Sequence, residues 1–266
     1  MRKSKVLEKL RAGETASCFK VNIADAQSAE IAAMSGFDCV WVDREHLAQD
    51  WSVYSGHVWA TKAYDTDLMV RVPRGSYSDY VKPLELDATG ILVPHVMGVA
   101  DAKKIIEMTR FYPKGKRAID GGSADGAYTN LDFHEYLQQA NEQRFVIFQI
   151  EDIEALNELD EIAALDGFDM LFFGPGDFSQ SIGAPGDWNN PLLLEARERV
   201  AKIAVKHGKF AATTGSIDKV DEFKQMGYSF INVGADVVGM TSYCNTIIAK
   251  FNKADSEKKT GLESYK

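Results

Sequence analysis

The sequence is poor in the features that mark secreted and membrane proteins. Only 3 of its 266 residues are cysteine. They are widely spaced with no Cys-x-x-Cys pair, so a disulfide framework is excluded and a reduced, cytoplasmic location is expected. No apolar run approaches the roughly 20 residues that cross a bilayer. None follows the basic residues near the start either, so neither a membrane span nor a secretory signal is expected.

Positive charge is also scarce. Lys and Arg number 30 against 39 Asp and Glu, which gives a formal net charge of −9, and no run is rich in Lys or Arg. Nucleic acid and anionic membrane surfaces are therefore not expected as partners, because clustered cations bind both. The hydrophobic fraction of 45% is typical of a globular domain. A small anionic substrate stays compatible with this charge, because one or two buried cations can form a local positive site.

Short apolar runs that follow a glycine recur along the chain. The glycines are Gly36, Gly90, Gly167 and Gly227. This pattern is typical of a helix that ends at a left-handed glycine and leads into a strand. The expected strands lie at 18–23, 37–43, 68–72, 91–93, 145–150, 168–173, 210–214 and 228–233. About eight strands, each followed by a helix, in a length near the roughly 250 residues of a TIM barrel predict a single-domain (β/α)8 barrel over residues 1–251.

An open doubly wound sheet is the main rival fold. It would need a Gly-x-Gly-x-x-Gly turn after an early strand, and the chain has none. Apolar residues spaced by about three from Ile153 to Leu165 predict one amphipathic helix, and Asp25 is expected to cap the helix that follows it. A charged, frayed tail is expected over 252–266.

Polar side chains directly follow several of the expected strands. In a TIM barrel the chemistry lies at the carboxyl ends of the strands. The residues in question are Asp43, Arg44, Glu45, His46, Arg71, Gln149, Glu151 and Asp177. Glu151 and Asp177, on neighbouring strands, suit a hard divalent ion such as Mg²⁺ or Mn²⁺ that keeps open positions for substrate. A helix cap or an ion pair would explain the same carboxylates.

Taken in order, these segments resemble the HpcH/HpaI aldolase family, the metal-dependent class II pyruvate aldolases of the 2-dehydro-3-deoxyglucarate and 4-hydroxy-2-oxoheptanedioate type. The matching segments are Gly36 to His46, Arg71 to Pro73, Gly90 to Pro94, Tyr112 to Arg117, Gln149 to Glu151 and Gly174 to Ser179. The resemblance implies a (β/α)8 barrel that cleaves a 2-oxo-4-hydroxy acid to pyruvate and an aldehyde through a metal-stabilised pyruvate enolate, or condenses them in reverse.

The resemblance also implies roles for the strand-end residues. His46 is implied to be the acid/base, oriented by Asp43, and Arg71 to contact the enolate oxygen. Such roles agree with the chemistry, because an imidazole titrates near neutral pH and a fixed cation stabilises a developing oxyanion. The residues implied to bind substrate are Gln149, Gly176 and Arg71.

The resemblance places the metal on Glu151 and Asp177. The implied cofactor is Mg²⁺ or Mn²⁺, with Co²⁺ as a further option, and no organic cofactor is implied. A homohexamer is implied as well, with the last helix, 237–251, packing on a neighbour. The apolar residues of that helix could equally close the chain's own barrel.

Other functions compete with this interpretation. A Schiff-base aldolase would need a lysine at the end of a strand, and only Lys20, in mid-strand, is a residual candidate. A lyase of coenzyme A thioesters, similar to the citrate lyase β subunit, and a non-catalytic barrel that binds a 2-oxo acid are further alternatives. The remaining histidines, His57, His95, His134 and His207, are expected to be surface or packing residues.

The long insertion 112–132 departs from the family pattern and leaves the aldehyde substrate undetermined. A loop of this length in a compact domain is usually functional. Its acidic residues, such as Asp125, are expected to be solvated or to line the aldehyde side of the pocket.

Overall fold

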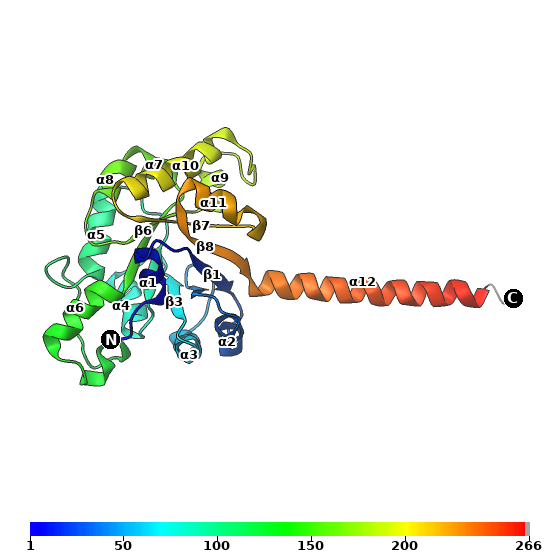
Figure 1. Cartoon of the computed structure of the whole chain (residues 1–266), viewed down its shortest axis with the longest axis horizontal. Helices are drawn as coiled ribbons and strands as arrows, with labels where there is room; N and C mark the ends of the chain where they lie inside the picture. Colours follow the sequence, from blue (N-terminus) through cyan, green and yellow to red (C-terminus); the bar gives the residue numbers. More distant parts are fainter. Residues whose placement is uncertain (264–266) are drawn as a thin grey trace.

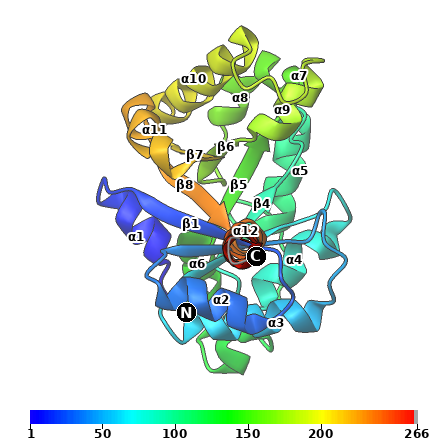
Figure 2. The ribbon, with the colours of Figure 1, turned by 90° about the vertical axis from the view of Figure 1, so that its right-hand side faces the viewer.

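The chain folds into a closed barrel of eight parallel strands with helices around it (Figures 1 and 2). A computed structural model describes residues 1–263, and of residues 254–263 it describes only the helical backbone. The strands are β1 (Ala16–Val21), β2 (Cys39–Asp43), β3 (Asp67–Arg71), β4 (Gly90–Val93), β5 (Phe145–Ile150), β6 (Met170–Phe173), β7 (Phe210–Gly215) and β8 (Tyr228–Ala235). Each strand pairs with the next, and β8 pairs with β1. The predicted TIM barrel is therefore confirmed, and the open doubly wound sheet is excluded.

Helices connect successive strands on the outside of the barrel. They are α1 (Lys5–Arg11), α2 (Ala26–Met34), α3 (Trp51–Lys62), α4 (Tyr77–Glu85), α5 (Val99–Thr109), η1 (Ala124–Thr129), α6 (Phe133–Gln143), α7 (Ile153–Asn157), α8 (Leu159–Ala163), α9 (Pro175–Ser181), α10 (Pro191–Lys206), η2 (Ile217–Lys219), α11 (Val220–Met226) and α12 (Asp236–Glu263). The predicted cap is confirmed, because the Asp25 carboxylate accepts the Gln27 N–H at 2.8 Å. None of the helices within the described part of the chain is long and apolar enough to cross a membrane.

Apolar side chains form two layers, one inside the barrel and one between strands and helices. Inside the barrel the rings of Trp41 and Phe172 meet edge to face at 5.8 Å. In the outer layer Phe148 stacks on Phe168 at 4.3 Å. Both faces of β2 to β6 are thus packed, which explains why these strands read as continuous apolar runs. Because the interior is filled, polar chemistry is confined to the ends of the strands.

The prediction of one helix from Ile153 to Leu165 is wrong. Two short helices, α7 and α8, meet at Glu158, where φ −111° and ψ 16° leave the helical region. The Glu158 carboxylate accepts the N–H of Val99, the first residue of α5, at 2.7 Å. The helix therefore breaks at a residue whose side chain is hydrogen-bonded to a neighbouring helix. The spacing of the apolar residues alone does not reveal this break.

Two of the four predicted glycine junctions, Gly36 and Gly227, are confirmed, with φ of 96° and 102°. Gly167 is left-handed as well, with φ 106°, but it lies three residues beyond Ala164, the cap of α8. Gly90 is different, since it is the first residue of β4 and the left-handed residue before it is Asp87, with φ 71°. Glycine is needed at position 90 for space, because a Cβ there would overlap the Phe145 ring.

The insertion 112–132 is anchored by a buried ion pair. The Arg117 guanidinium donates to Asp125 Oδ2 at 2.7 Å, and the Tyr136 hydroxyl donates to the same oxygen at 2.9 Å. The expectation that Asp125 is solvated is wrong, because its residue is 1% exposed. Its carboxylate fixes the base of the loop.

The last helix leaves the barrel. α12 starts at Asp236 directly after β8 and extends away from the barrel as one helix of 28 residues (Figure 1). The Asp236 carboxylate accepts the N–H groups of Asn22 and Ile23 at 2.9 Å, which anchors the start of α12 beside β1. The alternative that this helix closes its own barrel is wrong. The helix continues through most of the expected tail, and residues 264–266 of that tail lie outside the described residues.

Candidate metal centre and active site

The candidate site residues lie where the strands end, on one face of the barrel. Asp43 ends β2 and Arg71 ends β3, and the two are partners in the parallel register. Glu151 follows β5 directly, and Asp177 lies in the first turn of α9 after β6. The predicted positions at the carboxyl ends of the strands are therefore confirmed.

Asp43 holds Arg71 in place. Arg71 Nε donates to Asp43 Oδ1 at 3.1 Å, and its Nη2 donates to the other oxygen of the same carboxylate. Lys20 Nζ lies 2.9 Å from Asp43 Oδ2. The ring of Trp41 lies under both cations, 4.8 Å from Lys20 Nζ and 5.1 Å from Arg71 Cζ. The guanidinium is thus fixed on several sides before any substrate binds.

The pKa of Asp43 is strongly perturbed. Burial acts to raise it, but the hydrogen bond and charge of Arg71, with the charge of Lys20, lower the pKa from 3.8 to about 2. Asp43 is therefore an ionised anchor for Arg71 throughout the neutral range.

Replacing Asp43 with asparagine is expected to destabilise the protein in a pH-dependent way. A pKa lowered from 3.8 to about 2 corresponds to about 2 kcal/mol of stability. This contribution is fully present above pH 4 and is lost as the pH falls through 2. We therefore expect Asp43→Asn to lower the free energy of unfolding by about 2 kcal/mol at pH 7 and by roughly half as much at pH 3. Urea unfolding at both values measures the difference.

The control for this prediction is Asp50→Asn, at the exposed start of α3, where the side chain makes no capping hydrogen bond. It should change stability by less than about 0.5 kcal/mol at either pH. A gap between wild type and Asp43→Asn that stays constant from pH 7 to pH 3 would contradict the assignment of an ionised Asp43.

His46 is positioned differently from the expectation. The Asp43 carboxylate accepts the backbone N–H groups of Glu45 and His46, at 3.1 and 3.4 Å, and makes no hydrogen bond to the imidazole within residues 1–253. The His46 imidazole lies 3.5 Å from Glu45 Oε2, and its side chain is 58% exposed. Asp43 thus shapes the backbone turn that carries His46, whereas Glu45 is the carboxylate beside the ring.

Glu45 was identified in the sequence as a polar residue at a strand end, but no role was predicted for it. Its Oε2 lies 3.2 Å from Arg71 Nε and its Oε1 lies 3.6 Å from His95 Nε2. It therefore connects the arginine to the histidine that follows β4. Its position in the segment Asp43 to His46 indicated that it lies at the end of a strand. Nothing in the sequence gives the direction of its side chain.

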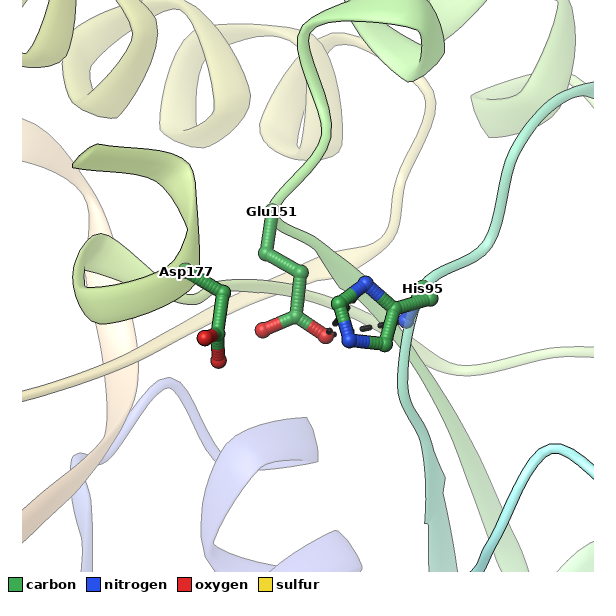
Figure 3. A group of neighbouring side chains, drawn as sticks. All are labelled: His95, Glu151 and Asp177. Carbon is green, nitrogen blue, oxygen red and sulfur yellow. Dashed lines mark hydrogen bonds and ion pairs between the residues drawn. The ribbon is translucent and has the colours of Figure 1, made fainter. Parts of the chain in front are cut away.

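Glu151 and Asp177 lie beside each other with His95 (Figure 3). One potential ligand atom from each of the three lies within 4.8 Å of the other two. Glu151 is buried, and burial raises its pKa to about 7, with the charges of Asp177 and Glu45 adding to the rise and His95 opposing it. Neither carboxylate pairs with a lysine or arginine in the stretch 1–253.

These residues fit a divalent cation. A buried carboxylate without a lysine or arginine partner is costly, and a hard cation bound between carboxylate oxygens would remove that cost. Glu151 Oε2 accepts a hydrogen bond from Gln149 Nε2, and Glu151 Oε1 accepts the His95 N–H at 2.9 Å. Hydrogen bonds of this kind orient metal ligands.

The turn after β6 requires glycine at one position. A Cβ at Gly174 would lie 2.7 Å from Glu151 Oε2 and 2.8 Å from Gln149 Nε2, which would displace both side chains. At Gly176 a Cβ would meet nothing within 4 Å, so the space beside its backbone is open. The contact of Gly176 with substrate stays a prediction.

His95 was expected to be a packing or surface residue, and it lies inside the site. Its φ of 48° is left-handed, which turns its N–H toward Glu151. Its Nδ1 lies 2.9 Å from Asp152 Oδ2, and its Nε2 lies 3.6 Å from Glu45 Oε1. The signal in the sequence was its place directly after β4. The backbone conformation that brings it to Glu151 could not be deduced from sequence. The other three histidines lie on or at the end of helices outside the barrel, namely His57, His134 and His207.

Lys20, the candidate for Schiff-base chemistry, is bound to another residue, and so is Lys209. Lys20 pairs with Asp43, as described, and Lys209 precedes β7, where its Nζ donates to the Phe168 carbonyl at 3.1 Å. Lys209 is thus at the end of the barrel opposite to Glu151. A free lysine at the carboxyl end of a strand is not found within residues 1–253.

Comparison with known proteins gives a consistent result. The family model described as HpcH/HpaI aldolase/citrate lyase matches residues 17–242, a range that contains every candidate site residue. The hydroxypyruvate/pyruvate aldolase of Pseudomonas aeruginosa is 31% identical over 230 residues, which cover 86% of this chain and 85% of that protein. The 4-hydroxy-2-oxovalerate aldolase of Rhodococcus jostii RHA1 is 32% identical over 249 residues, covering 91% and 93%.

The solved structures agree with these sequence matches. An HpcH/HpaI aldolase/citrate lyase family protein from Burkholderia cenocepacia J2315 superposes with a TM-score of 0.87 at 26% identity, covering 94% of this chain and 99% of that one.

Proposed function

The chain belongs to the HpcH/HpaI aldolase/citrate lyase family, and we propose that it is a metal-dependent carbon–carbon lyase that cleaves a 2-oxo-4-hydroxy acid to pyruvate and an aldehyde. The main support for this proposal is that a candidate metal site and a fixed arginine lie together on one face of the barrel. Glu151, Asp177 and His95 present ligand atoms within 4.8 Å, and Arg71 is fixed beside them by Asp43 and Glu45.

Arg71 is proposed to stabilise the oxygen on which negative charge develops. Cleavage of the C3–C4 bond leaves electron density on the pyruvate fragment, and a preorganised cation lowers the energy of that charge. The guanidinium makes no adjustment during the reaction, because its carboxylate partners and the Trp41 ring already hold it.

His46 is proposed to take the proton from the C4 hydroxyl during cleavage. An imidazole is suited to this step at neutral pH. Glu45, 3.5 Å from the ring, would stabilise the imidazolium that forms. The exposed position of His46 puts it at the mouth of the site, where the aldehyde portion of the substrate would lie.

Glu151 and Asp177, with His95, are proposed to hold the metal. When bound there, a divalent cation supplies Lewis-acid chemistry at the 2-oxo acid. Gln149 supports this assignment, because its Nε2 orients Glu151 while its buried Oε1 has no hydrogen-bond partner among the described residues. We propose Mg²⁺ or Mn²⁺ as the ion, with Co²⁺ as a further option, and an imidazole ligand would favour Mn²⁺ or Co²⁺ over Mg²⁺.

The proposal is tested by coupling pyruvate release to lactate dehydrogenase, with oxaloacetate and a panel of 2-oxo-4-hydroxy acids as substrates. Pyruvate should appear only when Mg²⁺, Mn²⁺ or Co²⁺ is added, and a chelator should abolish it. Turnover that persists in chelator and is trapped by borohydride would show Schiff-base chemistry and overturn the proposal.

Replacing His95 with glutamine is expected to weaken metal binding. Metal-bound histidines usually donate their second N–H to a carboxylate, as His95 Nδ1 can to Asp152. Loss of the imidazole should raise the dissociation constant for Mn²⁺ by about 10–100-fold, measured by electron paramagnetic resonance of free Mn²⁺. His134→Gln, on the exposed start of α6, is the control. An unchanged dissociation constant would show that His95 is not a ligand.

Two alternatives receive less support. A lyase of coenzyme A thioesters is disfavoured because the relatives reported above are named as aldolases of 2-oxo acids. A non-catalytic barrel would be expected to lack Arg71 or a metal ligand, and the chain keeps them in contact with their partners.

We further propose that the chain assembles with copies of itself through α12, as a hexamer. The helix extends from the barrel (Figure 1) with large apolar side chains exposed along it. They are Val237, Val238, Met240, Tyr243, Ile247, Ile248 and Phe251. An apolar surface of this size on an isolated helix needs a partner. Light scattering should give the mass of a hexamer, and the double variant Ile247→Asp, Ile248→Asp should reduce it. A monomer in the wild type would contradict the proposal.

A cytoplasmic location is also proposed. The three cysteines are free, and Cys18 and Cys39 are partners on the neighbouring strands β1 and β2 with both side chains buried. Free thiols are typical of a reducing compartment. Cell fractionation tests this location, and recovery of the protein outside the cytoplasmic fraction would contradict it.

A further inference from the structure

A charged residue occupies the core face of α10. Six residues of this helix are buried, at the 3–4 spacing of a helix face packed on the barrel. Five of them are apolar, and they are Leu193, Ala196, Val200, Ala201 and Ala204. The sixth is Arg197, which is 7% exposed. An apolar side chain would be expected at this position, so the arginine requires an explanation.

Arg197 has no counter-ion within the part of the chain whose side chains are described, residues 1–253. No carboxylate lies within 4 Å of its guanidinium, and its buried Nε makes no hydrogen bond. Its neighbours are the rings of Phe173 and Phe223, whose centroids lie 5.8 and 5.6 Å from Cζ. The other four buried arginines, Arg71, Arg110, Arg117 and Arg144, each pair with an aspartate. A buried cation without a partner is strongly unfavourable.

Arg197 lines a cavity of about 410 Å³ at the carboxyl end of the strands. The cavity lies among α9, α10 and α11, which occupy the same side of the barrel (Figures 1 and 2). Its polar lining offers donors, and it contains a second cation, Lys219, but no Asp or Glu. The lining side chains include Trp188, Asn189, Arg197, Ser216, Lys219 and Phe223.

We propose that this cavity binds the carboxylate or phosphate group of a small molecule. A guanidinium matches the geometry of both groups and binds them through paired hydrogen bonds. Ser216 and Lys219 line the cavity from the segment after β7, the part of a TIM barrel that frequently holds phosphate. Within the chain, Ser216 Oγ donates to Asp218 Oδ2 at 3.3 Å and Lys219 Nζ lies 3.8 Å from Glu222 Oε2. The anion would neutralise the positive charge of Arg197, which has no counter-ion within residues 1–253 of the chain. The size is at the lower end of the roughly 300–1,000 Å³ of small-molecule sites.

The cavity adjoins the metal residues. Pro175 lines it, and Asp177 follows two residues later in the same turn of α9. The bound group can therefore belong either to the far end of the aldehyde portion of the substrate or to a separate anion. Binding of the aldehyde portion depends on the proposed function, whereas binding of a separate anion does not.

The primary experiment measures binding of inorganic phosphate to metal-free protein by isothermal titration calorimetry at constant ionic strength. Arg197→Met keeps an apolar stem of similar length but removes the guanidinium and its charge. It should weaken phosphate binding by at least about tenfold. Arg199→Met, on the exposed side of the same helix, removes the same charge outside the cavity and should bind phosphate like the wild type.

The melting temperature without phosphate separates a binding role from a packing role. Removal of an uncompensated buried charge should leave the melting temperature of Arg197→Met equal to or above that of the wild type. Equal phosphate affinity in wild type and Arg197→Met, or no phosphate binding by the wild type, would overturn the proposal. A lower melting temperature with unchanged phosphate affinity would show a packing role and overturn it as well.

A second measurement identifies the source of the anion. Aldol condensation of pyruvate is compared for 4-oxobutanoate, which carries a distal carboxylate, and for butanal, which does not. If Arg197→Met raises KM for 4-oxobutanoate alone by about tenfold or more, the site binds the distal group of the substrate. If phosphate binding is lost while both aldehydes react as in the wild type, the ligand is a separate anion. Because phosphate binding needs no turnover, failure of the aldolase proposal would not affect the primary result.

Discussion

Glu151→Gln is expected to abolish both metal binding and pyruvate formation. The amide has almost the same shape as the carboxylate, so the packing against Gly174 and the bond to the His95 N–H are retained. What is lost is the buried negative charge, the main reason for a divalent cation to bind, together with the hydrogen bond from Gln149 Nε2, which an amide nitrogen cannot accept. Because a metal contributes several kcal/mol to such reactions, we expect a loss on the order of 10³-fold in kcat/KM. Mn²⁺ binding and the coupled pyruvate assay measure the two effects.

A suitable control for this variant is Glu154→Gln. Glu154 lies three residues further along, on the exposed side of α7, and its replacement makes the same change in charge and shape. It should bind Mn²⁺ and form pyruvate like the wild type. If Glu151→Gln retained wild-type Mn²⁺ affinity, the metal would have to lie elsewhere and the assignment of Glu151 would be wrong.

Arg71→Lys is expected to lower kcat by about 10²–10³-fold while leaving metal binding unchanged. The variant keeps a positive charge but loses the paired hydrogen bonds to Asp43. The ammonium group is then not held where the enolate oxygen forms. Exchange of the pyruvate methyl protons with deuterated water, followed by NMR, isolates enolate formation from cleavage and should slow by the same factor.

Arg74→Lys is the control. It tests whether the replacement of another arginine near β3 also slows the exchange of the pyruvate protons. Arg74 is three residues beyond Arg71, and its guanidinium pairs with Asp101. It should exchange the pyruvate protons at the wild-type rate. Undiminished exchange in Arg71→Lys would refute the role of Arg71 in stabilising the enolate.

The sequence predicted the fold well because the fold depends on repeated local patterns. Glycine junctions and apolar runs marked all eight strands, with boundaries that shifted by one or two residues. The residues at the strand ends were identified for the same reason, since strand order alone brings the carboxyl ends of a barrel together. Asp43 and Arg71 thus come from separate segments and meet because they are partners in the register of β2 and β3.

Features that depend on side-chain direction or on a single backbone angle could not be predicted. His95 reaches Glu151 through a left-handed φ, a conformation that histidine adopts rarely. The break at Glu158 depends on a hydrogen bond to a different helix. Arg197 appears in the sequence as one charge among several on an amphipathic helix, and only its burial distinguishes it from Arg199.

The packed interior of the barrel determines the order in which molecules can enter and leave. Side chains such as Trp41 and Phe172 fill the interior of the barrel, so substrate and products are expected to pass through the end of the barrel at which the strands finish. Arg71 and Glu151 are buried at this end, whereas the His46 side chain is 58% exposed. In cleavage, the aldehyde would depart first and pyruvate last. In condensation, pyruvate would have to bind before the aldehyde, which makes an ordered kinetic scheme a consequence of how the core is filled.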